Sequence, residues 1–332
     1  MARVRRSRFH LLEPVIEDSR SPIGSWRRAK EGLLASPLTN VGSRPAAYGP
    51  AEWGLTLLIG LIWGSAFLWI ALAVDSLSPG LVAFGRVALG AVALAVFPQA
   101  RIRIQREDWA RILAVAVAGN AGPALLFAIA ETELDSAVAG MVTSGTPVLS
   151  LVVAAFLLHK LPGRAQALGI GIGFIGIVMM TTPSLVGVRA APVGIVLVFL
   201  ATIGYGINSN IVVPLQQKYG GAAVTLWALV LSSAMLVPFA VRSLDGSEFS
   251  MPSVIAVLIL GVIGTGIVRA LSTTLAGRVG GPRMTTTTYL IPVVAIVLGV
   301  VFRSEVVQPI AIVGVVVVLS GAYLATRAVN PD

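Results

Sequence analysis

Ten stretches of about 20 apolar residues, most without a charge in the middle, limit what this chain can fold into. A helix needs about 20 apolar residues to cross roughly 30 Å of hydrocarbon, whereas barrel strands alternate in segments of about 10 residues. The stretches are 53–74, 80–99, 109–130, 135–158, 165–187, 192–213, 221–241, 252–276, 283–302 and 307–326. We therefore predict an all-α integral membrane protein with ten transmembrane helices.

The composition excludes soluble globular proteins and most metal enzymes. Hydrophobic residues make up 56% of the chain and charged residues 12%, whereas soluble domains average about 45–50% and about 25%. The chain has no Cys, and only His10 and His159 could supply an imidazole ligand. We therefore predict no metal site and no cofactor. The run Gly169-x-Gly171-x-Gly173 lies inside an apolar stretch without a following phosphate-binding Lys, so it indicates close helix packing rather than a phosphate loop. No enzyme motif remains.

The basic residues predict the orientation in the membrane. With both termini inside, ten basic residues beyond the first 51 lie in the cytoplasm, and only Arg189, Arg242 and Arg303 lie outside. This excess is typical of cytoplasmic loops and predicts a multi-pass protein of the plasma or inner membrane. It also accounts for the net charge of +9, so the charge does not indicate nucleic-acid binding. Residues 1–51 are basic and too polar to cross, which predicts a disordered cytoplasmic tail.

An internal repeat divides the rest of the chain. A shift of 145 residues aligns Pro147 with Pro292, Gly169 with Gly314, Gly176 with Gly321, Gly119 with Gly264, Asn120 with Thr265 and Ser144 with Tyr289. A shift of 142 aligns Trp63–Gly64 with Tyr205–Gly206. The pattern predicts two five-helix repeats, 52–187 and 188–327, followed by a short tail, 328–332. Because five is odd, the second copy enters the membrane from the opposite side, which gives an inverted repeat. Many secondary transporters are built from inverted repeats, and their substrate sites lie between the two copies. We expect close helix contacts at Gly64 and Gly206, and helix breaks that act as hinges at Pro147 and Pro292.

Several motifs resemble one transporter family. They are Ile62-Trp63-Gly64-Ser65-Ala66-Phe67, the stretch from Pro79 to Arg86, and the region from Pro292 through Ser304-Glu305-Val306 to Gly321. Over about residues 52–327 the chain resembles the drug/metabolite transporter superfamily, and within it the EamA-like ten-helix transporters. The resemblance implies export of small metabolites by alternating access. Family members carry a Gly-Glu-Arg-Leu-like turn after the fourth and ninth helices. Glu305 fits the second turn, and Lys160 occupies the place of the first.

Two arginines lie inside apolar stretches, where a charge costs about 2.5–3.5 kcal/mol on insertion scales. Arg86 is predicted either to bind a substrate carboxylate or to pair structurally with Glu131, Glu133 or Asp135 or with backbone carbonyls. Arg269 shares a helix face with Thr265, Ser272 and Thr273 and has no acid at its depth. It is predicted either to bind an anionic group of the substrate or to extend its long stem toward the interface.

The remaining candidate site residues are polar or aromatic residues inside the apolar stretches. A small-molecule pocket needs a few such contacts. The candidates are Trp63, Asn120, Ser144, Tyr205, Asn208 and Tyr289. The alternative for small polar residues is ordinary hydrogen bonding between membrane helices.

The acidic residues limit the mechanism. All fifteen carboxylates lie in the tail, in loops or at the ends of stretches, and Glu131, Glu133 and Asp135 form the nearest group. Proton-coupled carriers usually hold an ionisable group within the membrane. The sequence therefore gives no support to coupling to protons, and it fits exchange or facilitated export at least as well.

These features predict a transporter in the lipid bilayer that exports small molecules, with amino acids or related carboxylates favoured. The alternatives are efflux of hydrophobic drugs, or a scaffold or lipid-binding protein that transports nothing. The sequence does not decide whether the protein forms a homodimer.

Overall fold

The computed structural model describes residues 49–158, 163–186, 192–279 and 284–327, all within one structural unit, residues 37–332. Most of the predicted tail, His159, Lys160 and residues 328–332 lie outside the described residues.

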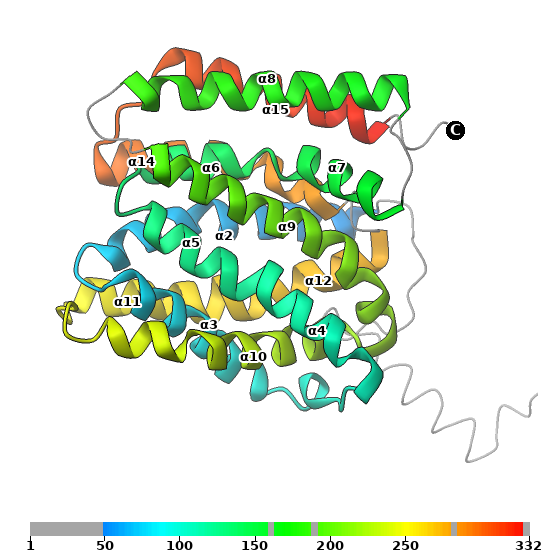
Figure 1. The fold of residues 1–332 in the computed structure, drawn as a ribbon, viewed down its shortest axis with the longest axis vertical. Coiled ribbons are helices and arrows are strands. Elements are labelled where there is room, and N and C mark those ends of the chain that lie inside the picture. The colour runs from blue at the N-terminus through cyan, green and yellow to red at the C-terminus, as the bar shows by residue number, and fades with distance from the viewer. Residues whose placement is uncertain (1–48, 159–162, 187–191, 280–283, 328–332) are drawn as a thin grey trace, which may run out of the picture. The chain divides into compact units, whose positions relative to one another are not determined.

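Helices account for the predicted apolar stretches, and the described residues contain no strand, which confirms the all-α class (Figure 1). Four stretches are interrupted helices, in which a π-helical segment, a short 3-10 helix or a break separates two parts. In chain order the elements are α2 (Pro50–Val74), α3 (Pro79–Ala95), η1 (Pro98–Arg101), η2 (Arg106–Asp108), α4 (Trp109–Ala116), η3 (Val117–Ala121), α5 (Gly122–Ala130), α6 (Ser136–Thr143), α7 (Thr146–Leu158), α8 (Arg164–Val186), α9 (Pro192–Tyr219), α10 (Gly221–Arg242), α11 (Met251–Ile259), η4 (Leu260–Ile267), α12 (Val268–Val279), η5 (Thr285–Tyr289), α14 (Ile291–Arg303) and α15 (Pro309–Arg327).

Six helices in the described part of the chain are long and apolar enough to cross a membrane. They are Pro50–Val74, Arg106–Ala130, Ser136–Val153, Pro192–Tyr219, Gly221–Arg242 and Met251–Val279. Four further apolar helices, at 79–95, 164–180, 287–303 and 309–324, are shorter than this. Membrane-spanning helices are therefore confirmed, and their predicted number, ten, stays a prediction.

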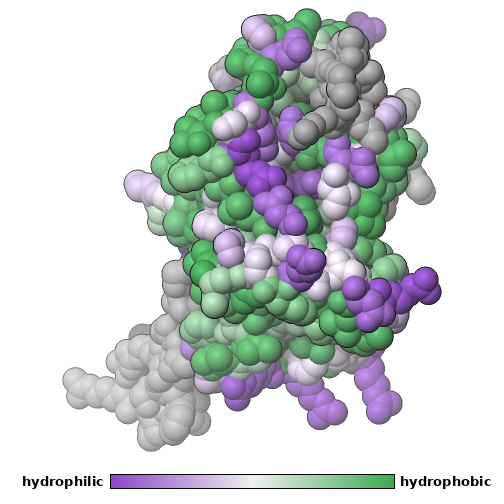
Figure 2. Space-filling view, turned by 90° about the vertical axis from the view of Figure 1, so that its left-hand side faces the viewer, coloured by the Kyte–Doolittle hydropathy of each residue, from purple (hydrophilic) through white to green (hydrophobic). Residues whose placement is uncertain are grey.

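Hydrophobic side chains cover much of the face drawn in Figure 2, and hydrophilic residues form a band across it. Many large apolar side chains are exposed, including Leu61 on α2, Val92 on α3 and Val301 on α14. Soluble monomers rarely expose so much apolar surface. Such a surface fits lipid as its surroundings.

Two helices widen into π-helical turns at matched positions of the two halves. Val117–Ala121 lies between α4 and α5, and Leu260–Ile267 lies between α11 and α12. The 145-residue shift places the first inside the second. In a π-helical turn a backbone N–H bonds to the carbonyl five residues earlier, which leaves nearby carbonyls for other donors, and such turns are frequent at functional sites.

Glycines let the helices of the two halves approach closely. A Cβ on Gly64 of α2 would lie 2.5 Å from the Cβ of Val294 on α14, and a Cβ on Gly206 of α9 would lie 3.1 Å from the backbone nitrogen of Ser150 on α7. Both glycines are therefore at close helix contacts, as the sequence predicts. The pair α8 and α15, which lie side by side in Figure 1, meets in the same way through Gly176 and Gly314.

Candidate functional site

A cavity lies among helices of both halves, with an empty volume of about 770 Å³, part of which is open to solvent. Its lining residues come from α2, α3, α5, α6, α7, α9, α12, η5 and α14, together with Met284. They are Trp63, Ala66, Phe67, Ile70, Arg86, Phe127, Thr143, Thr146, Tyr205, Asn208, Ser209, Val212, Arg269, Ser272, Thr273, Met284, Thr288 and Ile291.

Arg269 is held in the cavity between two aromatic rings. Its guanidinium carbon lies 5.6 Å from the ring centroid of Trp63 and 5.3 Å from that of Tyr205. Its Nε is buried and has no hydrogen-bond partner among the described residues. The side chain of Arg269 therefore keeps its guanidinium group inside the helix bundle. Cation–π contacts stabilise the guanidinium without using its hydrogen-bond donors.

Arg86 is more buried than Arg269, with 6% of its surface exposed. Its Nε donates to the hydroxyl of Thr265, 3.2 Å away, in the π-helical turn η4. No described carboxylate lies within ion-pair distance of Arg86 or Arg269, so the predicted alternative of an ion pair with Glu131, Glu133 or Asp135 is wrong in this conformation.

An aromatic wall completes one side of the cavity. The rings of Phe127 and Tyr205 stack at 5.9 Å, and Phe67 meets Phe127 edge to face at 5.5 Å. Trp63 is fixed by a 3.2 Å hydrogen bond from its indole nitrogen to the carbonyl oxygen of Gly264 in η4. The wall offers an apolar surface beside the two guanidinium groups.

Asn208 and Ser209 supply neutral polar groups. The side-chain amide of Asn208 lies directly over Gly119, where a Cβ would collide with it, and its Oδ1 is buried with no partner among the described residues. The hydroxyl of Ser209 hydrogen-bonds that of Ser150 at 2.7 Å. Asn208 therefore contributes a neutral amide side chain to the lining, with its oxygen packed against Gly119.

Three candidate residues do not line the cavity. Asn120 is buried in η3, where its Nδ2 donates to the carbonyl of Val115 at 3.1 Å. Ser144 donates to the carbonyl of Met141 at 2.6 Å, and Tyr289 lies in η5 with a buried hydroxyl. Of the polar candidates, the structure brings together Trp63, Arg86, Tyr205, Asn208 and Arg269.

The predicted hinge prolines lie at matched helix starts. Pro147 is the second residue of α7, after a break at residues 144–145, and Pro292 is the second residue of α14, after the 3-10 turn η5. Proline is favoured in the first turn of a helix because its missing N–H is not needed there. Their action as hinges stays a prediction.

Sequence reasoning missed most of the apolar part of the lining. Phe67 carries a signal, since it lies four residues after Trp63 and so shares its helix face. Phe127 and Met284 carry no signal that separates them from ordinary core residues.

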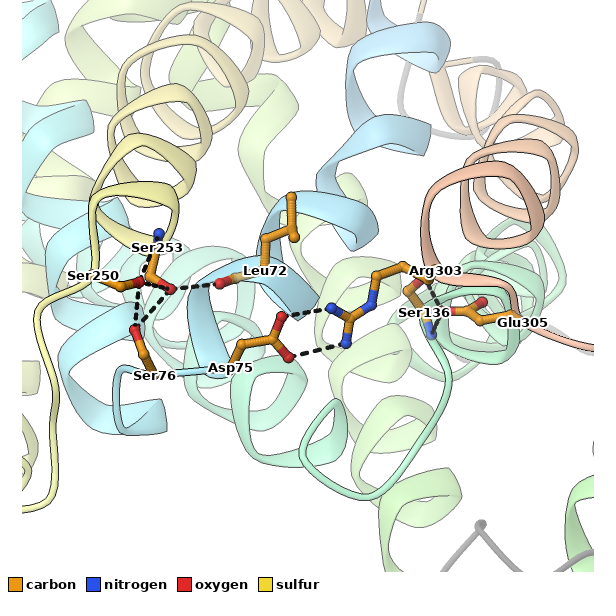
Figure 3. A network of polar contacts seen from close by, with 8 residues as sticks. All are labelled: Leu72, Asp75, Ser76, Ser136, Ser250, Ser253, Arg303 and Glu305. Carbon is orange, nitrogen blue, oxygen red and sulfur yellow. Dashed lines mark hydrogen bonds and ion pairs between the residues drawn. The ribbon is translucent and has the colours of Figure 1, made fainter.

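Polar contacts join helices at one end of the bundle, and we call this group the polar cap (Asp75, Ser76, Ser136, Ser250, Ser253, Arg303 and Glu305; Figure 3). Arg303 on α14 donates twice to Asp75 at the end of α2, at 2.5 and 3.0 Å. Ser76, Ser250 and Ser253 hydrogen-bond one another and connect the end of α2 to the start of α11. The cap therefore ties α2 to two helices of the second half.

Glu305 caps the start of α6. Its two carboxylate oxygens accept from the backbone N–H and hydroxyl of Ser136, at 2.9 and 2.6 Å, and from the backbone N–H of Ala137, at 2.8 Å. A helix N-terminus has unsatisfied N–H groups and a positive dipole end, both of which favour a carboxylate. Glu305 therefore stabilises the N-terminus of α6.

A second set of ion pairs lies beyond the other side of the cavity. Asp108 accepts from Lys218 at 2.7 Å and from the hydroxyl of Tyr219 at 2.6 Å, which joins the start of α4 to the end of α9. Arg278 and Glu52 approach to 3.4 Å between α12 and the start of α2. Polar ties therefore hold the helices on both sides of the cavity.

Glu131 lies in the predicted loop after α5, but its side chain is buried. It follows α5 directly, is only 7% exposed, and neither of its carboxylate oxygens has a hydrogen-bond partner among the described residues. No group of three His, Asp or Glu residues in the described ranges is arranged to hold a metal ion.

Known transporters and one solved structure are similar to this chain over most of its length. A family model described as "EamA-like transporter family" matches residues 53–182 and 192–327. An "Uncharacterized transporter" of Archaeoglobus fulgidus is 27% identical over 83% of this chain and 99% of its own. A "Probable terminal-alkyne amino-acid exporter" of Streptantibioticus cattleyicolor is 24% identical over 83% of this chain and 93% of its own. A solved crystal structure with 17% identity superposes with a TM-score of 0.64 and covers 84% of this chain and 98% of that one, which shows a shared fold.

Proposed function

The chain belongs to the EamA-like transporter family, and is thus an integral membrane transporter and not an enzyme; we propose that it exports small carboxylate metabolites, with amino acids or related carboxylates as substrates. Arg269 and Arg86 bind the carboxylate, and the aromatic wall holds the remainder of the molecule.

The observation that carries this proposal is the pair of arginines in one cavity whose lining contains no acid. Two like charges in a site of low dielectric repel each other, so an anion between them is favoured. The planar guanidinium fork matches a carboxylate with two parallel hydrogen bonds. Arg269 is poised for this, since its contacts with Trp63 and Tyr205 involve ring faces and leave its N–H groups available.

The rest of the lining narrows the substrate class. Phe67, Phe127 and Ile70 suit an apolar side chain, and the amide of Asn208 adds a neutral polar group. No carboxylate in the lining neutralises an ammonium group, so the site favours a net anion over a zwitterion of the same shape. The amino-acid exporter among the relatives supports substrates of amino-acid size.

We assign the transport cycle to alternating access between two inverted five-helix repeats that cross the membrane ten times, with both termini in the cytoplasm of the plasma or inner membrane. The matched breaks before Pro147 and Pro292, and the polar ties on both sides of the cavity, support this cycle. In each half-cycle one set of ties opens while the other holds.

A second candidate is efflux of hydrophobic drugs, which the aromatic wall favours. Such substrates use Phe127, Tyr205 and Trp63 and do not need a charge at Arg269. The two candidates therefore differ in the effect of removing that charge.

Counterflow in proteoliposomes tests the proposal, with labelled phenylalanine as the zwitterion and labelled phenylpyruvate as the anion. We compare the wild type with Arg269→Ala, and use Arg242→Ala, an exposed arginine at the end of α10, as the matched control. A hydrogen bond to a charged group contributes about 1.5–3 kcal/mol, so Arg269→Ala is expected to weaken substrate affinity roughly 10- to 150-fold.

We expect saturable counterflow in the wild type, with the anion preferred, and near-normal flux in Arg242→Ala. Equal flux in the wild type and Arg269→Ala would remove Arg269 from the site. Flux of an apolar dye that survives Arg269→Ala, without any carboxylate flux, would favour drug efflux instead.

A further inference from the structure

Glu131 is a buried carboxyl group that does not line the proposed substrate site. Only 7% of its surface is exposed, whereas Glu133, two residues later in the same loop, is exposed. Neither oxygen of Glu131 has a hydrogen-bond partner among the described residues. A buried polar group without a partner is uncommon and costly, and a buried ionised one more so.

Glu131 lies between the substrate cavity and the polar cap. It is four residues after Phe127, so it lies on the same helix face one turn beyond a residue that lines the cavity. The charged groups that act on it are Arg86 of α3, Arg303 at the end of α14 and Glu305 just after it. The first lines the cavity and the other two belong to the polar cap.

The protonation of Glu131 follows from these surroundings. Desolvation disfavours the charged carboxylate, and Glu305 adds like-charge repulsion, whereas Arg86 and Arg303 attract a negative charge. Neither arginine reaches ion-pair distance, since Arg303 is bonded to Asp75 and the Nε of Arg86 to Thr265. Burial, the largest of these effects, raises the pKa of the Glu131 carboxyl well above its usual range. The neutral acid is therefore the form that fits this conformation.

We propose that Glu131 is a proton-binding site whose carboxylate must take up one proton before the end of the bundle at the polar cap can close. When that end opens and water reaches Glu131, the carboxyl group ionises and releases the proton. Because an ionised Glu131 resists burial, deprotonation disfavours the conformation described here, in which Glu131 is buried. The proposal rests on the transport function proposed above, and it gives that transporter a dependence on pH that its sequence does not predict.

The test is the pH profile of counterflow for the wild type, Glu131→Gln and Glu133→Gln. Glutamine has the shape of the neutral acid and cannot ionise, so it permits closure at every pH. Counterflow by the wild type is expected to fall by about tenfold for each pH unit above the pKa of the carboxyl, because only the protonated fraction closes. Glu131→Gln should stay active across the same range, and Glu133→Gln, its exposed neighbour, should follow the wild type.

A second measurement is independent of flux. The infrared carbonyl stretch of a protonated carboxyl group should be present in the purified wild type at neutral pH, disappear as the pH is raised, and be absent from Glu131→Gln. The titration of the wild type alone tests the proposal if the variant does not fold.

The outcomes separate the two proposals. If the wild type shows no counterflow of any carboxylate, the proposed function fails, whatever the infrared spectrum shows. If the wild type transports but Glu131→Gln keeps the same pH profile, or if no protonated carboxyl band titrates, the proton site is wrong and the transport function stands.

Discussion

The helices that hold the two π-helical turns, residues 109–130 and 251–279, occupy matched places in the two halves and make different contributions to the cavity. In the first half, Asn120 of the turn bonds to its own helix, and the cavity receives the phenyl ring of Phe127. In the second half, Thr265 of the turn holds Arg86, and the cavity receives Arg269 one helical turn later. The same backbone feature therefore supports an apolar wall in one half and the charges in the other. A repeated scaffold can in this way build an asymmetric site.

Other matched positions are used alike. Gly64 brings α2 against α14 of the second half, and Gly206 brings α9 against α7 of the first half. The residues that they meet include Val294 and Leu149, which are related by the 145-residue shift. Trp63 and Tyr205 lie one residue before these glycines and contact Arg269 from two directions. Positions that set helix spacing are thus shared between the halves of this chain, and so are the two aromatic positions beside Arg269.

The largest effect is expected where both halves use a position alike. Gly64→Leu and Gly206→Leu each force a side chain into a close helix contact, and overpacking of this kind costs about 1–3 kcal/mol. Gly64→Leu should be the more harmful, because its Cβ would lie 2.5 Å from the Cβ of Val294. Thermal unfolding in detergent measures the loss. Gly171→Leu is the matched control, since a Cβ there meets nothing within 4 Å. Unchanged yield and melting temperature for Gly64→Leu would refute the packing assignment.

An intermediate effect is expected at the matched residues of the π-helical turns. Asn120→Leu leaves the carbonyl of Val115 without its side-chain donor, so we expect a loss of about 1–3 kcal/mol in stability and little change in KM. Thr265→Val removes the acceptor for Arg86 and should raise KM about fivefold, which corresponds to about 1 kcal/mol. Melting temperature and counterflow KM, measured on both variants, distinguish the two uses. If Asn120→Leu raised KM more than Thr265→Val did, the roles of the two turns would be reversed.

The smallest effect is expected at the two rings beside Arg269. Trp63→Phe weakens a cation–π contact and removes the hydrogen bond to Gly264, so substrate affinity should fall roughly two- to fivefold for a loss of about 0.5–1 kcal/mol. Tyr205→Phe keeps the ring face and should change affinity less. Counterflow KM for the two variants is the measurement. A larger loss in Tyr205→Phe would mean that the tyrosine hydroxyl, rather than its ring, contributes to binding.

Part of the candidate site was predictable because charge in a membrane helix is costly. Arg86 and Arg269 are identified by that cost alone, and the helix face of Arg269 extends to Ser272 and Thr273 by spacing. Spacing cannot separate Asn208, which faces the cavity, from Asn120, which bonds to its own helix. Both are amides inside apolar helices, and only the neighbouring helix decides which of them has a free surface.

The sequence by itself determined that this chain is an all-α membrane protein, where its apolar helices lie, and which glycines and prolines recur between its halves. These follow from local composition and period, because hydrocarbon requires every backbone group to be bonded within the helix. Tertiary structure alone decided that Trp63 bonds to Gly264, 201 residues away, and that Arg269 lies between two rings. It also decided that Glu131, which the sequence places in a loop, is buried with no hydrogen-bond partner among the described residues. Such features depend on which helices meet and at what rotation, and that is set by packing between segments far apart in the chain.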